Sequence, residues 1–371
     1  MGETARFAYL DGIRAVAIAA VLALHWVSWY VPLFHGGSIG VDVFFVLSGF
    51  IITTLLWRPE QAGYRAFVHR RVLRLYPALV GLVAGSVVLY AAVPWAPAGP
   101  VEVARRGVLV LTQASSVWAT DQSGSLWLPG LQPFGQTWSL AVEWYFYLLW
   151  PLLVLLARRR GWSAARLARL TAVAVVALYL VALPLPTFPF YFGPLARFAE
   201  LLAGGALALH LSAGARPTSR GGLPASVALA AIAAYALLGA DGHSPVYGFV
   251  GIPVGVAATL VLVHHGYAGG AGPTRSPVHR LLSHPAVAAV GRCSYSLYLW
   301  HVVPFLLLED APAPRLVLGP IAVAAAVGLT WLSFRWLERP FLRGRSDALR
   351  PAAAGLTSGS RAAAPRPRPA R

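Results

Sequence analysis

Several ionisable side chains of this 371-residue chain stand inside long apolar runs, and their types suit acid–base chemistry. They are Arg14, His25, Asp42, Glu143, Arg197 and His301. Charged groups at membrane depth are costly, so they are kept mainly where they are paired or functional. An imidazole titrates near neutral pH, which suits it to general acid–base catalysis. We therefore expect His25, Arg14 and Asp42 to take part in chemistry.

Structural interpretations of the same residues stay open beside the chemical ones. A lone His in a membrane helix often serves as a hydrogen-bond partner between helices, and for His301 both roles are open. Arg197 and Glu200 are spaced i,i+3, so they can form an ion pair on one helix face. The basic cluster at 70–74 can be positive charge that anchors a loop in the cytoplasm.

Five of these side chains fall in one layer. From a rise of about 1.5 Å per residue, His25 and Asp42 lie about 7 to 8 Å below the outer membrane boundary, and Glu143, Arg197 and His301 about 9 to 10 Å below it. A shared layer predicts a polar site between helices. Arg14 precedes His25 by 11 residues, which is about 20° from three whole turns and about 16 Å along the helix. That common face predicts one continuous passage.

The composition requires that membrane helices position these residues. The chain is 57% hydrophobic and only 12% charged, with a mean hydropathy of +0.64, so it has too little polar surface for a soluble protein. Its net charge of +17 sits in short Arg clusters between apolar runs, which argues against a nucleic-acid binder. The single Cys, Cys293, excludes an internal disulfide and a Cys-rich metal site.

Apolar runs of about 20 residues predict ten transmembrane helices, with one further surface or re-entrant helix at 101–119. The expected spans are 8–30, 37–57, 75–94, 137–156, 168–184, 191–211, 223–239, 247–265, 288–308 and 316–336. Arg-bearing segments at 58–74, 158–169, 216–220, 275–292 and from 335 onward alternate correctly only if 101–119 does not cross. This predicts a multi-pass plasma-membrane protein with both termini in the cytoplasm. We expect residues 1–343 to form the membrane domain and residues 344–371 to form a disordered basic tail in the cytoplasm.

Seven blocks of this sequence resemble, in order and spacing, the membrane acyltransferase-3 family of O-acyltransferases, which modify sugars, polysaccharides and antibiotics. The first block contains Leu-Asp-Gly-x-Arg followed by ten residues and a His. The blocks are YLDGIRAVAIAAVLALHW, IGVDVFFVLSGFIITTLL, HRRVLRLYPAL, TWSLAVEWYFYLLWPLL, RFAELLAGGALA, CSYSLYLWHVV and FRWLERPF. The resemblance covers about residues 8–341.

This resemblance implies ten membrane helices, an acyl-CoA donor that enters from the cytoplasm, and catalysis by the His of the first helix, here His25. Some family members carry an added helix and a periplasmic SGNH domain. Only about 30 residues follow Phe341, so we expect direct transfer from the membrane domain to the final acceptor. The acyl group, acetyl or another short chain, the sugar or glycoside acceptor and the oligomeric state stay open.

The expected mechanism uses His25 to take the proton of the acceptor hydroxyl, with Asp42, and Glu143 as a further candidate, orienting the ring. Arg70, Arg71 and Arg74 are candidates for clamping the CoA phosphates, and Arg14 for the diphosphate or the pantetheine amides. Direct transfer and an acyl-His intermediate both stay open as mechanisms. Several side chains are candidates for stabilising the oxyanion. These side chains are Arg197, Ser294, Ser296 and Tyr298.

A proton-coupled secondary transporter or flippase of a glycosylated substrate is the alternative, because buried His, Asp, Glu and Arg also suit a proton relay. The absence of a visible inverted repeat argues against it. We expect no permanently bound cofactor and no metal: acyl-CoA is a substrate, and the chain carries no HExxH zinc helix. The remaining partners are the lipid bilayer and the acceptor, and no nucleic acid.

Overall fold

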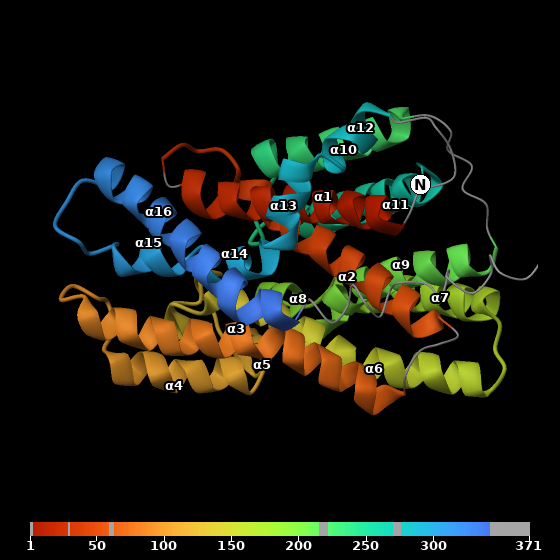
Figure 1. Cartoon of the computed structure of the whole chain (residues 1–371), viewed down its shortest axis with the longest axis horizontal. Coiled ribbons are helices and arrows are strands. Elements are labelled where there is room, and N and C mark those ends of the chain that lie inside the picture. The colour runs from red at the N-terminus through yellow and green to blue at the C-terminus, as the bar shows by residue number, and fades with distance from the viewer. Residues whose placement is uncertain (1–2, 29, 59–62, 215–221, 270–275, 342–371) are drawn as a thin grey trace, which may run out of the picture.

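The computed structural model describes residues 3–28, 30–58, 63–214, 222–269 and 276–341, and within these ranges it is a helical bundle without strands (Figure 1). The long helices are α1 (Glu3–Leu22), α2 (Ile39–Trp57), α3 (Tyr64–Ala92), α4 (Pro100–Leu111), α6 (Trp138–Arg159), α7 (Ala164–Ala182), α9 (Pro194–Ser212), α10 (Leu223–Leu238), α11 (Ile252–Gly269) and α16 (Arg315–Ser333). The short ones are α5 (Ser115–Thr120), α8 (Thr187–Phe192), α12 (Pro277–Leu282), α13 (Pro285–Arg292), α14 (Ser294–Trp300) and α15 (Val303–Leu307). The expected all-α membrane fold is confirmed.

Single turns of other helix types interrupt or join these elements. Three are π-helical turns, Ala23–Val27, Tyr247–Gly251 and Phe334–Glu338. Three are 3₁₀ turns, His35–Ser38, Pro129–Leu131 and Gly135–Thr137. π turns are rare and occur often at functional sites.

Eight helical segments of the described residues are long and apolar enough to cross a membrane, by length and composition. They are Ala8–Val27, His35–Trp57, Tyr64–Ala92, Gly135–Arg159, Ala164–Ala182, Thr187–Ser212, Tyr247–Tyr267 and Arg315–Phe341. Each overlaps one of the ten expected spans. α10 falls where a ninth was expected, and with 16 residues it is shorter than the others.

The expected span at 288–308 is not one helix but the series α13, α14 and α15. Arg292 is followed by Cys293, which lies outside the helical region with φ −94° and ψ 6°. Pro304 stands in the first turn of α15, where a missing backbone N–H is tolerated, so a new helix starts there. Hydropathy alone does not detect these breaks, because every piece is apolar.

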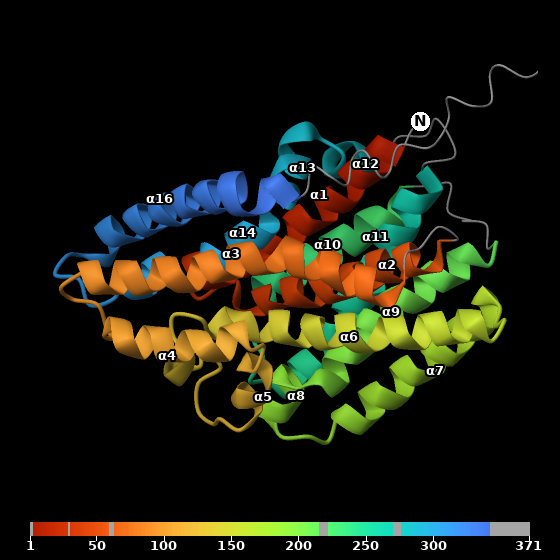
Figure 2. The ribbon, with the colours of Figure 1, turned by 60° about the horizontal axis from the view of Figure 1, so that its bottom comes forward.

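The expected non-crossing helix at 101–119 is divided into α4 and α5. α4 has 12 residues, which is about 18 Å of helix and too short for a bilayer core of about 30 Å. It packs along α3 at the end of the molecule where α3 finishes (Figures 1 and 2). This geometry agrees with a helix that does not cross.

The two ends of the bundle carry different connections. The start of α1 and the α6–α7 connection lie at one end, and the α1–α2, α3–α4 and α15–α16 connections lie at the other (Figures 1 and 2). Arg158 lies at the first of these ends, where its Nη1 donates to the carbonyl of Leu56 at 2.7 Å. The segment 216–220, Arg275 and the expected tail at 344–371 lie outside the described residues.

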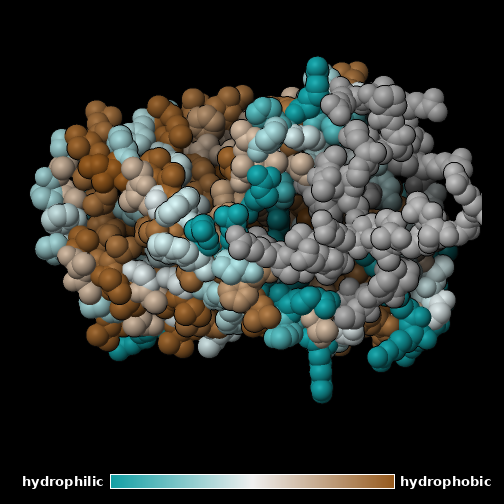
Figure 3. Space-filling view, in the orientation of Figure 1, coloured by the Kyte–Doolittle hydropathy of each residue, from teal (hydrophilic) through white to brown (hydrophobic). Residues whose placement is uncertain are grey.

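Apolar side chains face outward over much of the bundle, as expected for a surface in contact with lipid (Figure 3). Leu316 is 79% exposed, Leu223 75% and Val101 74%. Such exposure is unfavourable in water but neutral in hydrocarbon. The assignment to the membrane therefore rests on the surface as well as on helix length.

Glycines allow the helices that carry the polar residues to approach closely. A Cβ at Gly49 of α2 would stand 1.8 Å from the carbonyl oxygen of Leu201, and a Cβ at Gly204 of α9 1.9 Å from that of Val46. Close backbone contact through small residues is a common way to pack membrane helices. It holds α2 and α9 side by side, and these helices carry Asp42, Arg197 and Glu200.

Candidate functional site

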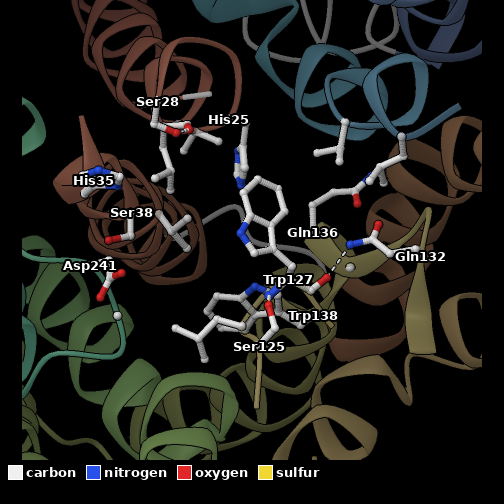
Figure 4. Close-up of a pocket in the computed structure, with 18 of the residues that line it drawn as sticks. His25, Ser28, His35, Ser38, Ser125, Trp127, Gln132, Gln136, Trp138 and Asp241 are labelled. Atoms are coloured by element: carbon white, nitrogen blue, oxygen red, sulfur yellow. Dashed lines mark hydrogen bonds between the residues drawn. The ribbon is translucent and has the colours of Figure 1, made fainter. Parts of the chain in front are cut away.

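The larger cavity is lined in part by the α1–α2 connection, the segment between α5 and α6 and the α15–α16 connection, and it has a volume of about 680 Å³. Its wall combines aromatic rings with hydroxyl, amide, imidazole and carboxyl groups (Figure 4). The residues labelled there are His25, Ser28, His35, Ser38, Ser125, Trp127, Gln132, Gln136, Trp138 and Asp241. A cavity of this size suits a small organic ligand.

His25 reaches this cavity from the π turn at the end of α1. The extra residue of a π turn changes which side chains face a given direction, so His25 departs from the 3.6-residue period that was used to place it on the Arg14 face. The ring of Trp127 stands edge-on to the His25 ring, with 5.0 Å between centroids. His25 is half-buried.

His301 is the polar partner of His25. Nε2 of His301 lies 2.9 Å from Nδ1 of His25, and Nδ1 of His301 lies 2.7 Å from the carbonyl oxygen of Tyr298. The His301 side chain is fully buried. Trp26 also donates from its indole nitrogen to the carbonyl of His301 at 2.9 Å. The two imidazoles are thereby fixed between α1 and the α14–α15 break.

Asp42 lies in a separate, sealed cluster. Its Oδ1 accepts from Arg197 Nη1 at 2.9 Å, and its two oxygens are 2.7 and 2.9 Å from the hydroxyl of Tyr247. Arg197 Nη1 also donates to Glu200 Oε1 at 2.7 Å. The side chains of all three charged residues are 0% exposed. The structure thus brings Asp42, Arg197 and Glu200 together. The side chain that forms a polar contact with the His25 ring is His301 rather than Asp42.

The guanidinium of Arg197 stands behind the aromatic wall of the larger cavity. Its Cζ lies 4.8 Å from the ring centroid of Tyr191 and 5.4 Å from that of Trp138, both of which line the cavity. Its Nε donates to the carbonyl of Tyr191 at 2.8 Å. Arg197 therefore supports the cavity wall from the protein side, and the expected oxyanion role would need it on the other side of these rings.

Arg14 and Glu143 line a second, smaller cavity of about 60 Å³ between α1, α2, α6 and α14. Ser294 also lines it. Glu143 was expected beside His25 but lies with Arg14 instead. Val41 and Tyr298 line both cavities, so the two are neighbours that meet at these side chains.

The cytoplasmic candidates on α3 differ in their surroundings. Arg70 is exposed, whereas Arg71 is only 7% exposed, with its Cζ 5.1 Å from the ring centroid of Phe67 and 5.3 Å from that of Tyr147. Arg74 is half-buried. Within the described part of the chain, the Nε atoms of Arg74 and Arg14 are buried without a hydrogen-bond partner. Each of these two guanidinium groups therefore has a free N–H that can donate to an anionic ligand.

The three hydroxyl candidates on α14 occupy different places. Tyr298 contacts the Ser139 hydroxyl at 2.7 Å and donates to the Gln136 carbonyl at 2.9 Å. Ser296 donates to Glu338 at 2.8 Å, so it ties α14 to the π turn that follows α16. Ser294 lines the smaller cavity. Tyr298 is the member of this set that reaches the larger cavity.

Sequence reasoning missed several residues of the site. Trp127, His35 and His243 line the larger cavity from connections, where residue spacing carries no information about direction. Tyr247 and Glu338 stand in π turns and hydrogen-bond to site residues, as His25 does. In the described ranges no three His, Cys, Asp or Glu side chains are grouped so that they could hold a metal ion.

Comparison with known proteins gives one family. A family model described as an acyltransferase domain, acyltransferase 3, matches residues 7–335. No solved structure matches the chain.

Three curated relatives illustrate the similarity. The O-acetyltransferase OatA of Staphylococcus aureus (strain NCTC 8325 / PS 47) is 28% identical over 79% of this chain and 49% of its own length. The putative peptidoglycan O-acetyltransferase YrhL of Bacillus subtilis is 29% identical over 89% of this chain and 54% of its own. The peptidoglycan O-acetyltransferase OatA of Listeria monocytogenes is 29% identical over 89% and 55%. The chain therefore spans about half the length of the curated relatives that it matches.

Proposed function

This chain belongs to the acyltransferase-3 family, and from that premise we propose that it transfers an acyl group from acyl-CoA to a hydroxyl of a sugar or glycoside. The observation that carries the proposal is the position of His25, whose imidazole lines the larger cavity next to the Tyr298 boundary with the smaller one. A donor that reaches Tyr298 from the smaller cavity would arrive at the wall of the larger cavity, which the His25 ring also lines. A transporter would need no such pairing of a base with two separate cavities.

The larger cavity is the proposed acceptor site. Sugars are bound by aromatic rings together with polar groups that fix orientation, and this cavity offers Trp127 and Trp138 beside Gln132, Gln136 and Asp241. The three relatives of this chain are named for O-acetyl transfer, and two of them for peptidoglycan. These names support acetyl as the first candidate for the acyl group and a cell-wall sugar as the first candidate for the acceptor. The proposed orientation puts this cavity outside and both termini in the cytoplasm, since Arg-rich connections favour that side.

The smaller cavity is the proposed end of the donor route. Arg14 and Arg74 carry buried Nε atoms without a partner among the described residues, and guanidinium groups bind phosphate well. Glu143 shares the cavity with Arg14 and balances its charge before the donor arrives. At about 60 Å³ the cavity holds only a few water molecules, so donor entry has to separate the helices that line it.

The proposed chemistry is a direct acyl transfer. Nε2 of His25 takes the proton of the acceptor hydroxyl while that oxygen attacks the thioester carbonyl. The tetrahedral intermediate then collapses, the carbon–sulfur bond breaks, and the imidazolium returns the proton to the CoA sulfur. The products are the sugar ester and free CoA. An acyl-His25 intermediate is the variant, in which Nε2 itself attacks the thioester.

The decisive test supplies labelled acetyl-CoA and a peptidoglycan fragment to the full chain in proteoliposomes and measures both the ester and the released CoA thiol. His25→Ala should lower the rate by about 10²- to 10⁴-fold, the usual contribution of a general base. His210→Ala is the matched control, because His210 is exposed near the end of α9 and should transfer at the original rate. Unchanged transfer by His25→Ala would exclude His25 as the base, and transport without release of CoA would favour a transporter.

The donor route has its own test. Arg74→Ala should raise the apparent KM for acetyl-CoA, while the exposed Arg70→Ala should raise it less. A fall in kcat with an unchanged KM for the donor would make Arg74 a structural residue. Competition by free CoA, measured in parallel, reports on the same site without requiring turnover.

A further inference from the structure

We infer that His301 is a positioning residue that holds neutral His25 in the tautomer with its proton on Nδ1 and its lone pair on Nε2. The inference about the tautomer stands on the hydrogen-bond chain alone. Its consequence for catalysis rests on the proposed function.

The chain starts from a carbonyl that can only accept. The carbonyl oxygen of Tyr298 lies 2.7 Å from Nδ1 of His301. Because a carbonyl has no proton to donate, Nδ1 of His301 must carry the hydrogen. A neutral imidazole has one N–H, so the lone pair of His301 is on Nε2.

The position of the proton on the His25 ring follows from that on the His301 ring. Nε2 of His301, as an acceptor, lies 2.9 Å from Nδ1 of His25. Nδ1 of His25 must therefore be the donor, which leaves the lone pair of a neutral His25 on Nε2. A histidine whose partner sets its tautomer is a recurrent device for orienting an active imidazole.

The burial of His301 supports its neutral state. Its side chain is 0% exposed, and among the described residues no ion pair reaches it. A second proton on this ring would create a charge without a carboxylate partner away from water, which is strongly unfavourable. It would also place an N–H on Nε2 and reverse the polarity of the contact with His25.

The break in the expected 288–308 helix provides the free acceptor. α14 ends at Trp300, and the last carbonyls of a helix lack intrahelical partners. The side chain of His301 satisfies the carbonyl of Tyr298, and the side-chain amide of Gln136 satisfies that of Leu299 at 2.8 Å. In an unbroken helix, the Tyr298 carbonyl would instead accept from the backbone N–H four residues on. The break therefore has a consequence for the chemistry of His25.

Histidine tautomers can be measured directly by ¹⁵N and ¹³C spectroscopy of imidazole-labelled protein in lipid bilayers. The signal of His25 is identified among the ten histidines by its loss in His25→Gln. At a pH where His25 is neutral, we expect a single tautomer with the proton on Nδ1. A proton found on Nε2 in the unchanged protein would overturn the inference, whether or not any variant folds.

Two substitutions of His301 separate the two contacts. His301→Asn keeps an amide that can donate to Tyr298 but has no atom that reaches His25. The Nδ1–H of His25 then keeps only the backbone carbonyl of Val21 as an acceptor, so the tautomer with the proton on Nε2 should become detectable. His301→Gln places an amide oxygen near the former Nε2, so more of the Nδ1–H tautomer should remain. An Asn variant with an unchanged His25 tautomer would contradict the positioning role.

The same variants report on catalysis. We expect His301→Asn to lower kcat by about 10- to 100-fold, as when a partner that orients a metal-bound His is removed. The KM for acetyl-CoA should stay near its original value, and His301→Gln should recover part of kcat. If the unchanged protein transfers no acyl group, the proposed function fails, while the tautomer measurement still decides the inference. If transfer occurs and kcat is the same in the Asn variant, His301 does not position the base.

Discussion

Side chains that were expected in one layer of the membrane fall into two groups in the structure, and these groups differ in access and in charge. The His25–His301 pair is neutral in the state inferred above, and its His25 ring lines a cavity of about 680 Å³. The Asp42–Arg197–Glu200 cluster contains one guanidinium and two carboxyl groups and is sealed, with each of these side chains 0% exposed. A neutral pair beside a cavity can exchange a proton with a ligand. A sealed charge cluster can instead fix the helices that bring the cavity wall together.

This difference shows that depth in the membrane does not identify a catalytic residue. Asp42 and His25 occur at comparable positions in neighbouring helices, yet one contacts Tyr247 and Arg197 and the other lines the cavity. What separates them is direction around the helix. The comparison predicts that variants of the cluster change stability first, whereas variants of the pair change turnover first.

Arg197→Met should have the largest effect on stability. Without the guanidinium, Asp42 and Glu200 are left as buried carboxyl groups without a cation, and breaking a buried pair this way costs about 3–5 kcal/mol. Thermal unfolding in detergent micelles measures the loss. His25→Ala is the contrast and should unfold near the original temperature. Equal stability losses for the two variants would erase the distinction between cluster and pair.

Gly204→Ala should also destabilise the frame of the cluster, by about 1–3 kcal/mol, since its Cβ would meet the Val46 carbonyl at 1.9 Å and force α9 away from α2. Gly328→Ala in α16 is the matched control, because nothing lies within 4 Å of its Cβ position. Replacing an uncrowded helical Gly with Ala favours the helix by about 0.5–1 kcal/mol. The two variants should therefore shift the unfolding temperature in opposite directions.

Trp127→Ala tests the side of the pair that faces the cavity. An aromatic contact of this kind is worth about 0.5–1.5 kcal/mol, so kcat/KM for the acceptor should fall by about 2- to 10-fold with stability unchanged. Trp331→Ala, at a 60% exposed position of α16, should leave kcat/KM for the acceptor unchanged. Kinetics with varied acceptor at saturating acetyl-CoA provide the measurement. A change confined to the KM of the donor would argue that Trp127 lines a different substrate site.

Glu200→Gln should have the smallest effect, below about 1 kcal/mol. The amide keeps an oxygen for the 2.7 Å contact with Arg197, and the remaining Arg197–Asp42 pair is balanced in charge. Thermal unfolding is again the measurement. A loss as large as that of Arg197→Met would mean that Glu200, rather than Asp42, is the principal partner of the guanidinium.

Hydropathy and loop charge predicted most of the fold because both depend on sums over many residues. Eight of the ten expected spans overlap helices long enough to cross, and α4 is short where a non-crossing helix was expected. The breaks at Cys293 and at 301–302 were not predictable in this way, because the run 288–308 is long and mostly apolar on both sides of each break.

The site was only partly predictable, because neighbours depend on helix rotation and on loops. The expected pair of Arg197 and Glu200 at i,i+3 is present, since it needs only the period of one helix. The partner of His25 was not found, because the contact with His301 joins residues 276 positions apart and depends on a helix break. Glu143 was assigned to the His25 layer by counting residues, whereas packing of α6 against α2 and α3 puts it in the smaller cavity with Arg14.

The three π turns have a consequence for how this fold tolerates insertions and deletions. A π turn within a helix is equivalent to one inserted residue. Deleting one residue from Ala23–Val27, Tyr247–Gly251 or Phe334–Glu338 would convert that π turn into an ordinary α turn, so the helix on either side would keep its orientation and the side chains within the turn would change direction. His25, Tyr247 and Glu338 would then face different neighbours, while the hydropathy profile would hardly change. Single-residue gaps at these turns are therefore where homologous membrane domains can exchange one set of site contacts for another without losing a helix.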